Sequence, residues 1–363
     1  MKHHLDLLIR FAALLVVMGG FGLTAHPVRA QPLPFTGTNL SGGEFGDVHP
    51  GKAPIYGKDF TYPNEGEMAY FASKGMNVIR LPFRWEVLQP TPKTPLVPAE
   101  VQRLKDVVAA ATGKGLVVLL DPHDYARYYG KVIGGPDVSD GDFADFWGRL
   151  AGDFRGNPRV WFGLMNEPHD MPTPQWFDAA NAAVAAIRKA GAKNLILVPG
   201  NGWSGAHSWE GSGNDMLLQI KDPAHHSAFE AHQYLDADSS GTHPDAVSAT
   251  VGSERLRAFT DWCRRHHQRA FLGEFGVGAS DTGRQAIGDM LTMMEQNRDV
   301  WIGYTWWSAG PWWGNYMFSI EPDKGLDRPQ MSYLQPHLHG VSPGLKARST
   351  RMGRPFGASE RAR

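Results

Sequence analysis

Short apolar runs rich in β-branched and aromatic residues recur along this chain, with helical patterns between most of them. The runs have the length of strands, and the segments between them have the spacing of amphipathic helices. The predicted strands are residues 35–40, 78–83, 116–121, 160–165, 195–199, 228–232, 270–273 and 301–306. Strands that alternate with helices indicate a parallel sheet, and eight such units predict an α/β fold of the (β/α)8 TIM-barrel type in one domain.

The helical segments support this interpretation. They are predicted at residues 65–74, 98–114, 143–154, 174–190, 253–267 and 284–297. Three of them end in a glycine signal at Gly75, Gly115 and Gly191, as helices commonly do. A doubly wound open sheet is the alternative fold, but no glycine-rich dinucleotide fingerprint follows any of the strands.

The two ends of the chain differ from the middle. Residues 1–30 contain basic residues, an apolar stretch at 11–23 and a small-residue cleavage pattern at 28–30, which together predict a secretory signal peptide. An uncleaved membrane anchor is the alternative. Residues 341–363 are rich in lysine and arginine and poor in apolar residues, so we predict a disordered basic tail. The barrel domain is therefore expected at residues 31–340, in a protein secreted to the periplasm or the extracellular space.

Charge and cysteine content exclude some classes of protein. The chain has 36 Lys and Arg against 37 Asp and Glu, so no net field draws it to nucleic acid or to anionic lipid. Cys263 is the only cysteine; an internal disulfide is excluded, and we expect a small buried side chain. The 12 tryptophans offer flat apolar faces that suit sugar rings, although we assign half of them to the core.

Two predicted strands end in a glutamate. The run 160–165 is followed by Asn166-Glu167-Pro168, and the run 270–273 is followed by Glu274. An unpaired buried carboxylate is costly, so a buried strand has little reason to end in one unless the group is used. The ends of barrel strands meet at one mouth. Two carboxylates at one mouth are the groups that cleave a glycosidic bond.

Other strands deliver further polar and aromatic side chains to the same mouth. The candidates are Arg80, His123, Asn166, His232, Tyr234 and Trp307. Each one alone also fits a structural polar or core residue. Together with Glu167 and Glu274 they come from six different strands, and this joint occurrence favours one functional site.

These motifs together resemble a known family. The segments are residues 77–82 (NVIRLP), 121–127 (DPHDYAR), 161–169 (WFGLMNEPH), 231–236 (AHQYLD), 273–276 (GEFG) and 303–307 (GYTWW). In this order the chain resembles glycoside hydrolase family 5, the cellulase family of clan A, and within it the endo-β-1,4-glucanase-like subfamily. The resemblance extends from about residue 35 to about residue 327. The chain departs from the family pattern at Pro122, where isoleucine is expected, and it lacks the cysteines of fungal members.

The resemblance implies roles for two catalytic residues. Glu167 matches the family's acid/base and Glu274 its nucleophile, in a retaining double displacement through a covalent glycosyl-enzyme intermediate. Glu167 is then expected to hold a proton while Glu274 is ionised. Arg80 and Tyr234 are expected to hydrogen-bond Glu274, and Asn166 to bond the 2-hydroxyl of the sugar.

The remaining matched residues are expected to bind the sugar. His123 and His232 are expected to bond ring hydroxyls or to orient Glu167, and Trp307 is expected to form a stacking floor. Further aromatic residues follow the strands and could be sugar platforms or loop packing: Tyr125, Tyr128, Tyr129, Trp203, Trp209, Trp312, Trp313 and Tyr316.

No cofactor or metal is predicted. Asp236, Asp238 and Asp245 lack the glycine and the closing glutamate of a calcium loop, so we interpret this segment as a solvated loop. The predicted protein is a monomeric retaining endo-β-1,4-glucanase whose partner is a β-glucan polysaccharide or oligosaccharide. One alternative keeps the mechanism and changes the substrate to mannan, xyloglucan, mixed-linkage glucan or xylan. The other is a non-catalytic barrel that binds glucan.

Overall fold

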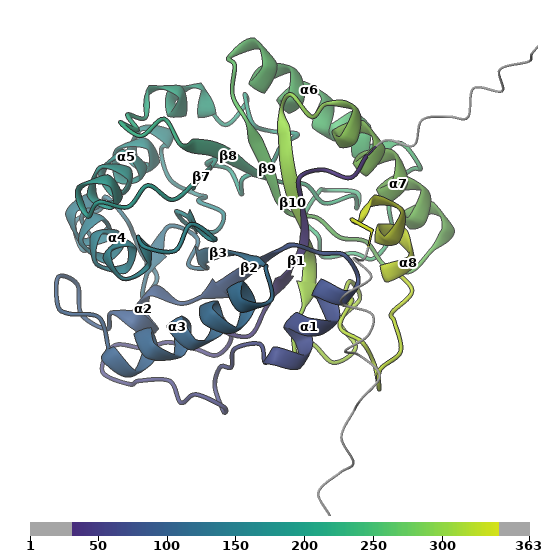
Figure 1. Cartoon of the computed structure of the whole chain (residues 1–363). Coiled ribbons are helices and arrows are strands. Elements are labelled where there is room, and N and C mark those ends of the chain that lie inside the picture. Colours follow the sequence, from purple (N-terminus) through teal and green to yellow (C-terminus); the bar gives the residue numbers. More distant parts are fainter. Residues whose placement is uncertain (1–30, 341–363) are drawn as a thin grey trace, which may run out of the picture. The chain divides into compact units, whose positions relative to one another are not determined.

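Eight parallel strands close into a barrel in the computed structural model, which describes residues 31–340 (Figure 1). The predicted signal peptide and basic tail lie outside the described residues. The order around the barrel is β1 (Phe35–Leu40), β10 (Trp301–Ala309), β9 (Ala270–Glu274), β8 (Ser227–His232), β7 (Ile196–Pro199), β6 (Val160–Gly163), β3 (Val117–Pro122) and β2 (Val78–Phe83). The predicted (β/α)8 barrel is confirmed, and each of the eight predicted strands is present.

Helices surround the strands, as Figure 1 shows. They are α1 (Glu65–Ser73), α2 (Trp85–Leu88), α3 (Pro98–Gly113), α4 (Asp140–Phe154), α5 (Thr173–Lys189), α6 (Val251–Arg265), α7 (Asp281–Gln296) and α8 (Met331–Leu334), with two short 3-10 helices, η1 (Asn214–Gln219) and η2 (Gln335–His337). The chain between β7 and β8 carries η1 in place of an α-helix. Within the described residues, none of the helices is long and apolar enough to span a lipid bilayer.

Small structural details explain where the helices begin and end. Asn64 and Ser139 form capping boxes at the starts of α1 and α4, which satisfy backbone N–H groups that lack a partner inside the helix. Gly75, Gly115 and Gly191 have φ angles of 95°, 86° and 83°. This left-handed backbone costs glycine little, so the predicted glycine signals are confirmed.

Two separate hairpin strands, β4 (Arg127–Tyr128) and β5 (Lys131–Val132), pair antiparallel beside the barrel. They were not predicted, because two-residue strands carry no periodic signal. They follow the exit of β3, and the Tyr128 hydroxyl donates to the carbonyl oxygen of Gln89 over 2.6 Å, which ties the hairpin to the segment after α2.

The barrel interior changes from apolar to charged toward the mouth. Val78, Val117 and Ala228 belong to a buried apolar cluster with residues from other strands. Successive residues of a strand face opposite sides, so residues at even spacing from these three face the interior too. Arg80 lies two residues beyond Val78, and Glu230 lies two beyond Ala228. The same alternation that packs the barrel therefore places charged groups beneath the site.

The outer core lies between strands and helices and takes most of the tryptophans. Seven are buried there, namely Trp85, Trp147, Trp176, Trp209, Trp262, Trp301 and Trp306. Trp161 is buried in the barrel interior, so eight are buried in all, more than the half expected from the sequence. Cys263 is fully buried in α6, as predicted, and burial raises the pKa of its thiol.

Candidate active site

Glu274 ends β9 at the barrel mouth and is 3% exposed. Arg80 Nη1 donates a hydrogen bond to Oε1 over 2.9 Å, and the Tyr234 hydroxyl donates to Oε2 over 2.7 Å. These are the two contacts expected from the sequence. Both donors stabilise the ionised carboxylate. Two donors thus fix both oxygens of Glu274 in place, and its role as the nucleophile is a prediction.

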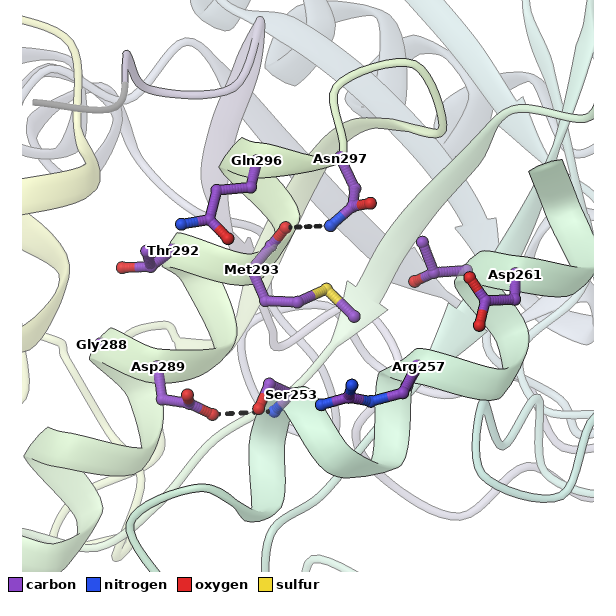
Figure 2. A pocket seen from close by; sticks show the side chains of 10 residues that line it. Ser253, Arg257, Asp261, Gly288, Asp289, Thr292, Met293, Gln296 and Asn297 are labelled. Carbon is purple, nitrogen blue, oxygen red and sulfur yellow. Dashed lines mark hydrogen bonds between the residues drawn. The ribbon is translucent and has the colours of Figure 1, made fainter. Parts of the chain in front are cut away.

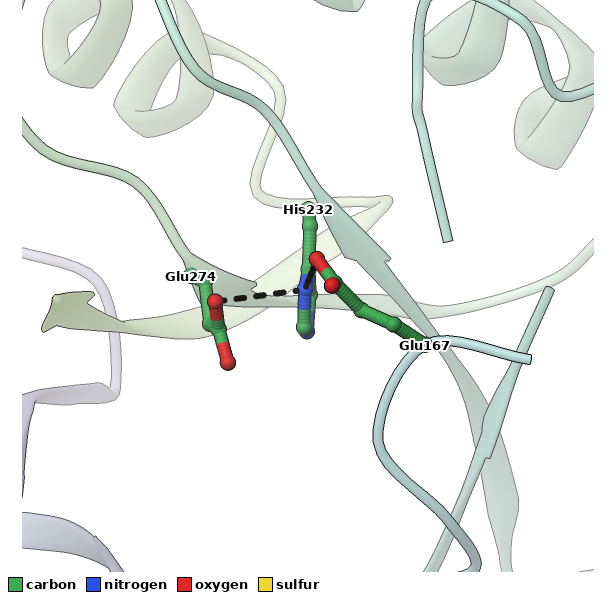
Figure 3. A group of neighbouring side chains, drawn as sticks. All are labelled: Glu167, His232 and Glu274. Atoms are coloured by element: carbon green, nitrogen blue, oxygen red, sulfur yellow. Dashed lines mark hydrogen bonds and ion pairs between the residues drawn. The ribbon is translucent and has the colours of Figure 1, made fainter. Parts of the chain in front are cut away.

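Glu167 lies beyond the end of β6 and faces Glu274 across His232 (Figure 3). Its φ angle is 40°, a left-handed conformation that a non-glycine residue adopts at a cost of about 1–3 kcal/mol and that is common at functional sites. His232 Nδ1 lies 2.7 Å from Glu167 Oε1 and 3.6 Å from Glu274 Oε2. Oxygen atoms of the two carboxylates lie within 4.8 Å of one another.

His232 is surrounded by negative charge. Burial disfavours the charged imidazole, but Glu274, Glu167 and Glu230 outweigh this effect and raise the pKa of His232 to about 10. The His232 ring therefore carries a proton at neutral pH, and its Nδ1–H donates to Glu167. This geometry fits the expectation that His232 orients Glu167.

The raised pKa of His232 predicts a pH dependence of stability. A group whose pKa is 6.5 when unfolded and about 10 when folded stabilises the fold fully below pH 6.5, and the stabilisation is lost as the pH rises through 10. Between these limits the free energy of unfolding should fall by up to about 1.4 kcal/mol per pH unit. Urea denaturation of wild type and His232→Gln at pH 7, 8 and 9 measures this slope. If the free energy of unfolding changed with pH equally in both proteins, the raised pKa of His232 would be contradicted.

Arg80, Asn166 and His123 lie beneath and beside the two glutamates. Arg80 and Asn166 are fully buried, whereas His123 reaches the cavity surface. Arg80 Nη2 donates to Asn166 Oδ1 over 2.7 Å. The His123 ring stacks on Trp307 with centroids 5.2 Å apart and an angle of 15° between the planes. The structure thus brings all eight predicted site residues together at one end of the barrel.

A cavity of about 530 Å³ lies over these groups. Of the predicted residues, His123, Glu167, His232, Tyr234, Glu274 and Trp307 line it. Tyr125, Trp203 and Tyr316 also line it, so these aromatic loop residues are available to a ligand. Trp209 and Tyr128 are 1% and 5% exposed, and the possibility that they are sugar platforms is wrong. Trp209 packs against Phe259 and other core rings instead.

A second hollow of about 600 Å³ lies away from the mouth, between α6 and α7 (Figure 2). Ser253 and Arg257 of α6 face Asp289 and Gln296 of α7 across it. The backbone N–H of Ser253 donates to Asp289 Oδ2 over 3.0 Å. None of the predicted site residues lines this hollow, so size alone does not identify the functional cavity.

Two buried carboxylates of the site were not among the predicted site residues. Glu230 Oε1 accepts from Arg80 Nε over 2.9 Å and lies 3.4 Å from His232 Nε2. Asp121 Oδ2 lies 3.0 Å from Arg80 Nη1. The available sequence signal was a charged residue at an inward position of an otherwise apolar strand. Gly273 accommodates Glu230, because a Cβ there would lie 2.2 Å from Glu230 Oε1.

Within residues 31–340, two groups of side chains have the spacing of metal ligands. The first consists of Glu167, His232 and Glu274, in which His232 Nδ1 already faces both carboxylates. In the second, Asp236 is 2% exposed and accepts hydrogen bonds from the backbone N–H groups of Gly241, Thr242 and His243. Asp238 and Asp245 are exposed, as expected for a solvated loop, whereas Asp236 departs from this interpretation because its buried carboxylate organises the loop from within.

A closed parallel barrel with two facing carboxylates at its mouth defines the class of barrel-type glycoside hydrolases. Residues 29–310 match the family model described as cellulase (glycosyl hydrolase family 5). The chain belongs to this family.

Individual relatives agree with the family match. The chain is 40% identical over 328 residues to an endo-β-1,4-glucanase B of Aspergillus niger, which covers 90% of this chain and 96% of the relative. A solved structure of XacCel5A in complex with cellopentaose is 47% identical, with a TM-score of 0.82 over 84% of this chain and 99% of that chain. The endoglucanase Cel5A of Pseudomonas stutzeri in complex with cellobiose is 35% identical, with a TM-score of 0.79 over 86% and 94% of the two chains.

Proposed function

We propose that this protein is a retaining endo-β-1,4-glucanase that hydrolyses internal bonds of β-1,4-glucan. The observation that carries the proposal is the approach of Glu167 and Glu274, whose oxygens lie within 4.8 Å of one another. Retaining enzymes hold their carboxyl groups about 5–5.5 Å apart, whereas inverting enzymes separate them by about 6.5–9.5 Å to admit a water. The names and bound cello-oligosaccharides of the relatives support β-1,4-glucan as the substrate.

In the first step, a Glu274 oxygen attacks the anomeric carbon while the bond to the leaving sugar breaks. Glu167 gives its proton to the departing oxygen, so that the leaving chain departs as an alcohol. In the second step, Glu167 takes a proton from a water molecule while the water oxygen attacks the anomeric carbon. The bond between that carbon and Glu274 breaks, and the Glu274 carboxylate is released. Arg80 and Tyr234 hold the Glu274 carboxylate on opposite oxygens and stabilise it whenever it is free.

Aromatic residues on two sides of the cavity supply sugar platforms. Trp307, resting on His123, forms one floor. Trp203 forms another: it is 49% exposed and stacks on His169 with centroids 3.4 Å apart and an interplanar angle of 6°. The backbone N–H of Trp203 donates to the carbonyl oxygen of Pro168 over 3.0 Å, which places Trp203 beside Glu167 and therefore on the leaving-group side.

Replacing Trp203 with alanine should raise KM for cellopentaose about fivefold, because an exposed ring stack contributes on the order of 1 kcal/mol. The effect should be smaller for an aryl cellobioside, whose leaving group does not extend as far. Trp312→Ala is the matched control, since Trp312 is 41% exposed but does not line the cavity. Equal KM values for wild type and Trp203→Ala on cellopentaose would contradict the platform.

The substrate assignment is tested by reducing-end release from carboxymethyl cellulose, mannan, xyloglucan, mixed-linkage glucan and xylan in parallel. The proposal expects the highest kcat/KM on the unbranched β-1,4-glucan. An equal or higher value on mannan or xylan would overturn the choice of sugar and leave the two-carboxylate mechanism intact.

The proposed enzyme is exported and acts as a monomer on glucan outside the cytoplasm. The support is the sequence pattern of residues 1–30 and the extracellular location of polymeric glucan. The mature protein should begin at Gln31, which N-terminal sequencing of the exported form would show. An uncleaved N-terminus in the membrane fraction would contradict this.

A further inference from the structure

Four side chains form a closed ring of contacts beneath the proposed active site. Arg80 Nη2 donates to Asn166 Oδ1 over 2.7 Å, and Asn166 Nδ2 lies 3.1 Å from His123 Nε2. His123 Nδ1 lies 2.9 Å from Asp121 Oδ2, and the same oxygen lies 3.0 Å from Arg80 Nη1. All four residues are at most 4% exposed, so water does not complete these bonds.

The ring permits a single arrangement of hydrogens. A guanidinium only donates, so the atom of the Asn166 amide that faces Arg80 Nη2 must be the accepting oxygen, Oδ1, while Asp121 Oδ2 forms an ion pair with Arg80 Nη1. The Asn166 amide nitrogen then points at His123 Nε2, which must carry a lone pair. The hydrogen of the neutral imidazole is therefore on Nδ1 and donates to Asp121. A charged imidazole would direct an Nε2–H at the Asn166 amide hydrogens, and burial also lowers the pKa of His123.

We propose that Asp121 is a positioning residue that fixes His123 as the Nδ1–H form and, through it, the amide of Asn166. The inference deepens the proposed function and rests on it. An amide has two N–H groups, and one is used by His123. The second has no hydrogen-bond partner within residues 31–340, and Asn166 directly precedes Glu167. Because Arg80 already occupies Oδ1 and His123 one N–H, Asn166 can contact the sugar 2-hydroxyl only as a donor, through its second N–H.

Glu230 provides a matched comparison. Like Asp121, it is a buried carboxylate in contact with Arg80, over 2.9 Å. Its other contact is His232 and not His123, so it lies outside the ring. Neutralising Glu230 removes a negative charge beside Arg80, as neutralising Asp121 does. It should leave the orientation of the Asn166 amide, with Oδ1 toward Arg80 and Nδ2 toward His123, unchanged.

The test compares aryl β-cellobioside with the analogue that lacks the 2-hydroxyl on the ring to be cleaved. The ratio of kcat/KM on the substrate with the 2-hydroxyl to kcat/KM on the analogue without it should fall at least tenfold in Asp121→Ala, and equally in Asn166→Ala. In the double variant this ratio should fall little further than in either single variant. Asp121→Asn should recover most of the ratio, because its amide oxygen can occupy the position of Oδ2. Glu230→Gln should keep the wild-type ratio even if its rate falls.

Equal losses on both substrates in Asp121→Ala, or no recovery in Asp121→Asn, would overturn the proposal. If the alanine variant does not fold, ¹⁵N NMR of histidine-labelled wild type decides. The His123 signals should show a hydrogen on Nδ1 and none on Nε2 from pH 5 to pH 8. A hydrogen on Nε2, or titration in this range, would overturn it. Failure to hydrolyse any β-glycan would refute the proposed function instead. The NMR result would still test whether His123 is held in the Nδ1–H form.

Discussion

Glu274→Ala is expected to lower kcat on carboxymethyl cellulose at least about ten-thousandfold, which corresponds to about 5.5 kcal/mol of transition-state stabilisation. Within residues 31–340, this carboxylate is the only group that both Arg80 and Tyr234 hold by hydrogen bonds, and alanine leaves no atom to form the bond to the anomeric carbon. Binding of the substrate should change far less than kcat. Steady-state kinetics together with calorimetric binding of cellopentaose separate the two effects.

Azide should restore part of the activity of Glu274→Ala, because a small anion can enter the space of the lost carboxylate. Its attack on the β-glycoside should give an α-glycosyl azide, which NMR identifies. Glu295→Gln is the control: Glu295 is also buried, at 5% exposure, but belongs to α7 and contacts His337 outside the mouth. Turnover by Glu274→Ala without azide at a rate near that of wild type would show that another group is the nucleophile, or that the barrel hydrolyses glucan differently.

Glu167→Ala is expected to lower kcat/KM on cellopentaose at least about a thousandfold, since acid catalysis typically contributes about 10²–10⁴-fold. The loss should be much smaller on 2,4-dinitrophenyl cellobioside, whose leaving group departs without a proton. This difference follows from the role of Glu167 as a proton donor, and a parallel set of kinetics on the two substrates measures it.

Azide gives a second readout for Glu167→Ala. It should accelerate release of the glycosyl-enzyme without needing a base and should give a β-glycosyl azide, opposite in configuration to the product of Glu274→Ala. An equal loss on cellopentaose and on the dinitrophenyl substrate would contradict the acid role. It would instead indicate that Glu167 acts through binding or through the position of His232.

The barrel and its mouth could be predicted because their signals are local. Each strand is a short apolar run, and the residues that follow it meet at one end of a parallel barrel. Glu167 and Glu274 follow such runs directly, so their approach required only the fold. The family resemblance then indicated the other six residues, and the structure places all eight at one end of the barrel.

The residues beneath the mouth could not be predicted in the same way. Glu230 and Asp121 face inward because of a two-residue alternation, but strands buried on both faces show no polar alternation that would reveal it. Their partners come from other strands, which only barrel closure brings together. Similarly, Trp209 follows a strand and yet packs in the core, and Asp236 lies in a polar segment whose backbone folds around its carboxylate.

Trapping of the glycosyl-enzyme tests the central claim most directly. Incubation with a 2-deoxy-2-fluoro-cellobioside that carries a good leaving group, followed by proteolysis and mass spectrometry, should show one cellobiosyl adduct per chain on the peptide that contains Glu274. The adduct should be absent from Glu274→Ala. Attachment to a different residue, or hydrolysis that releases the α-anomer without any adduct, would contradict a retaining mechanism based on Glu167 and Glu274.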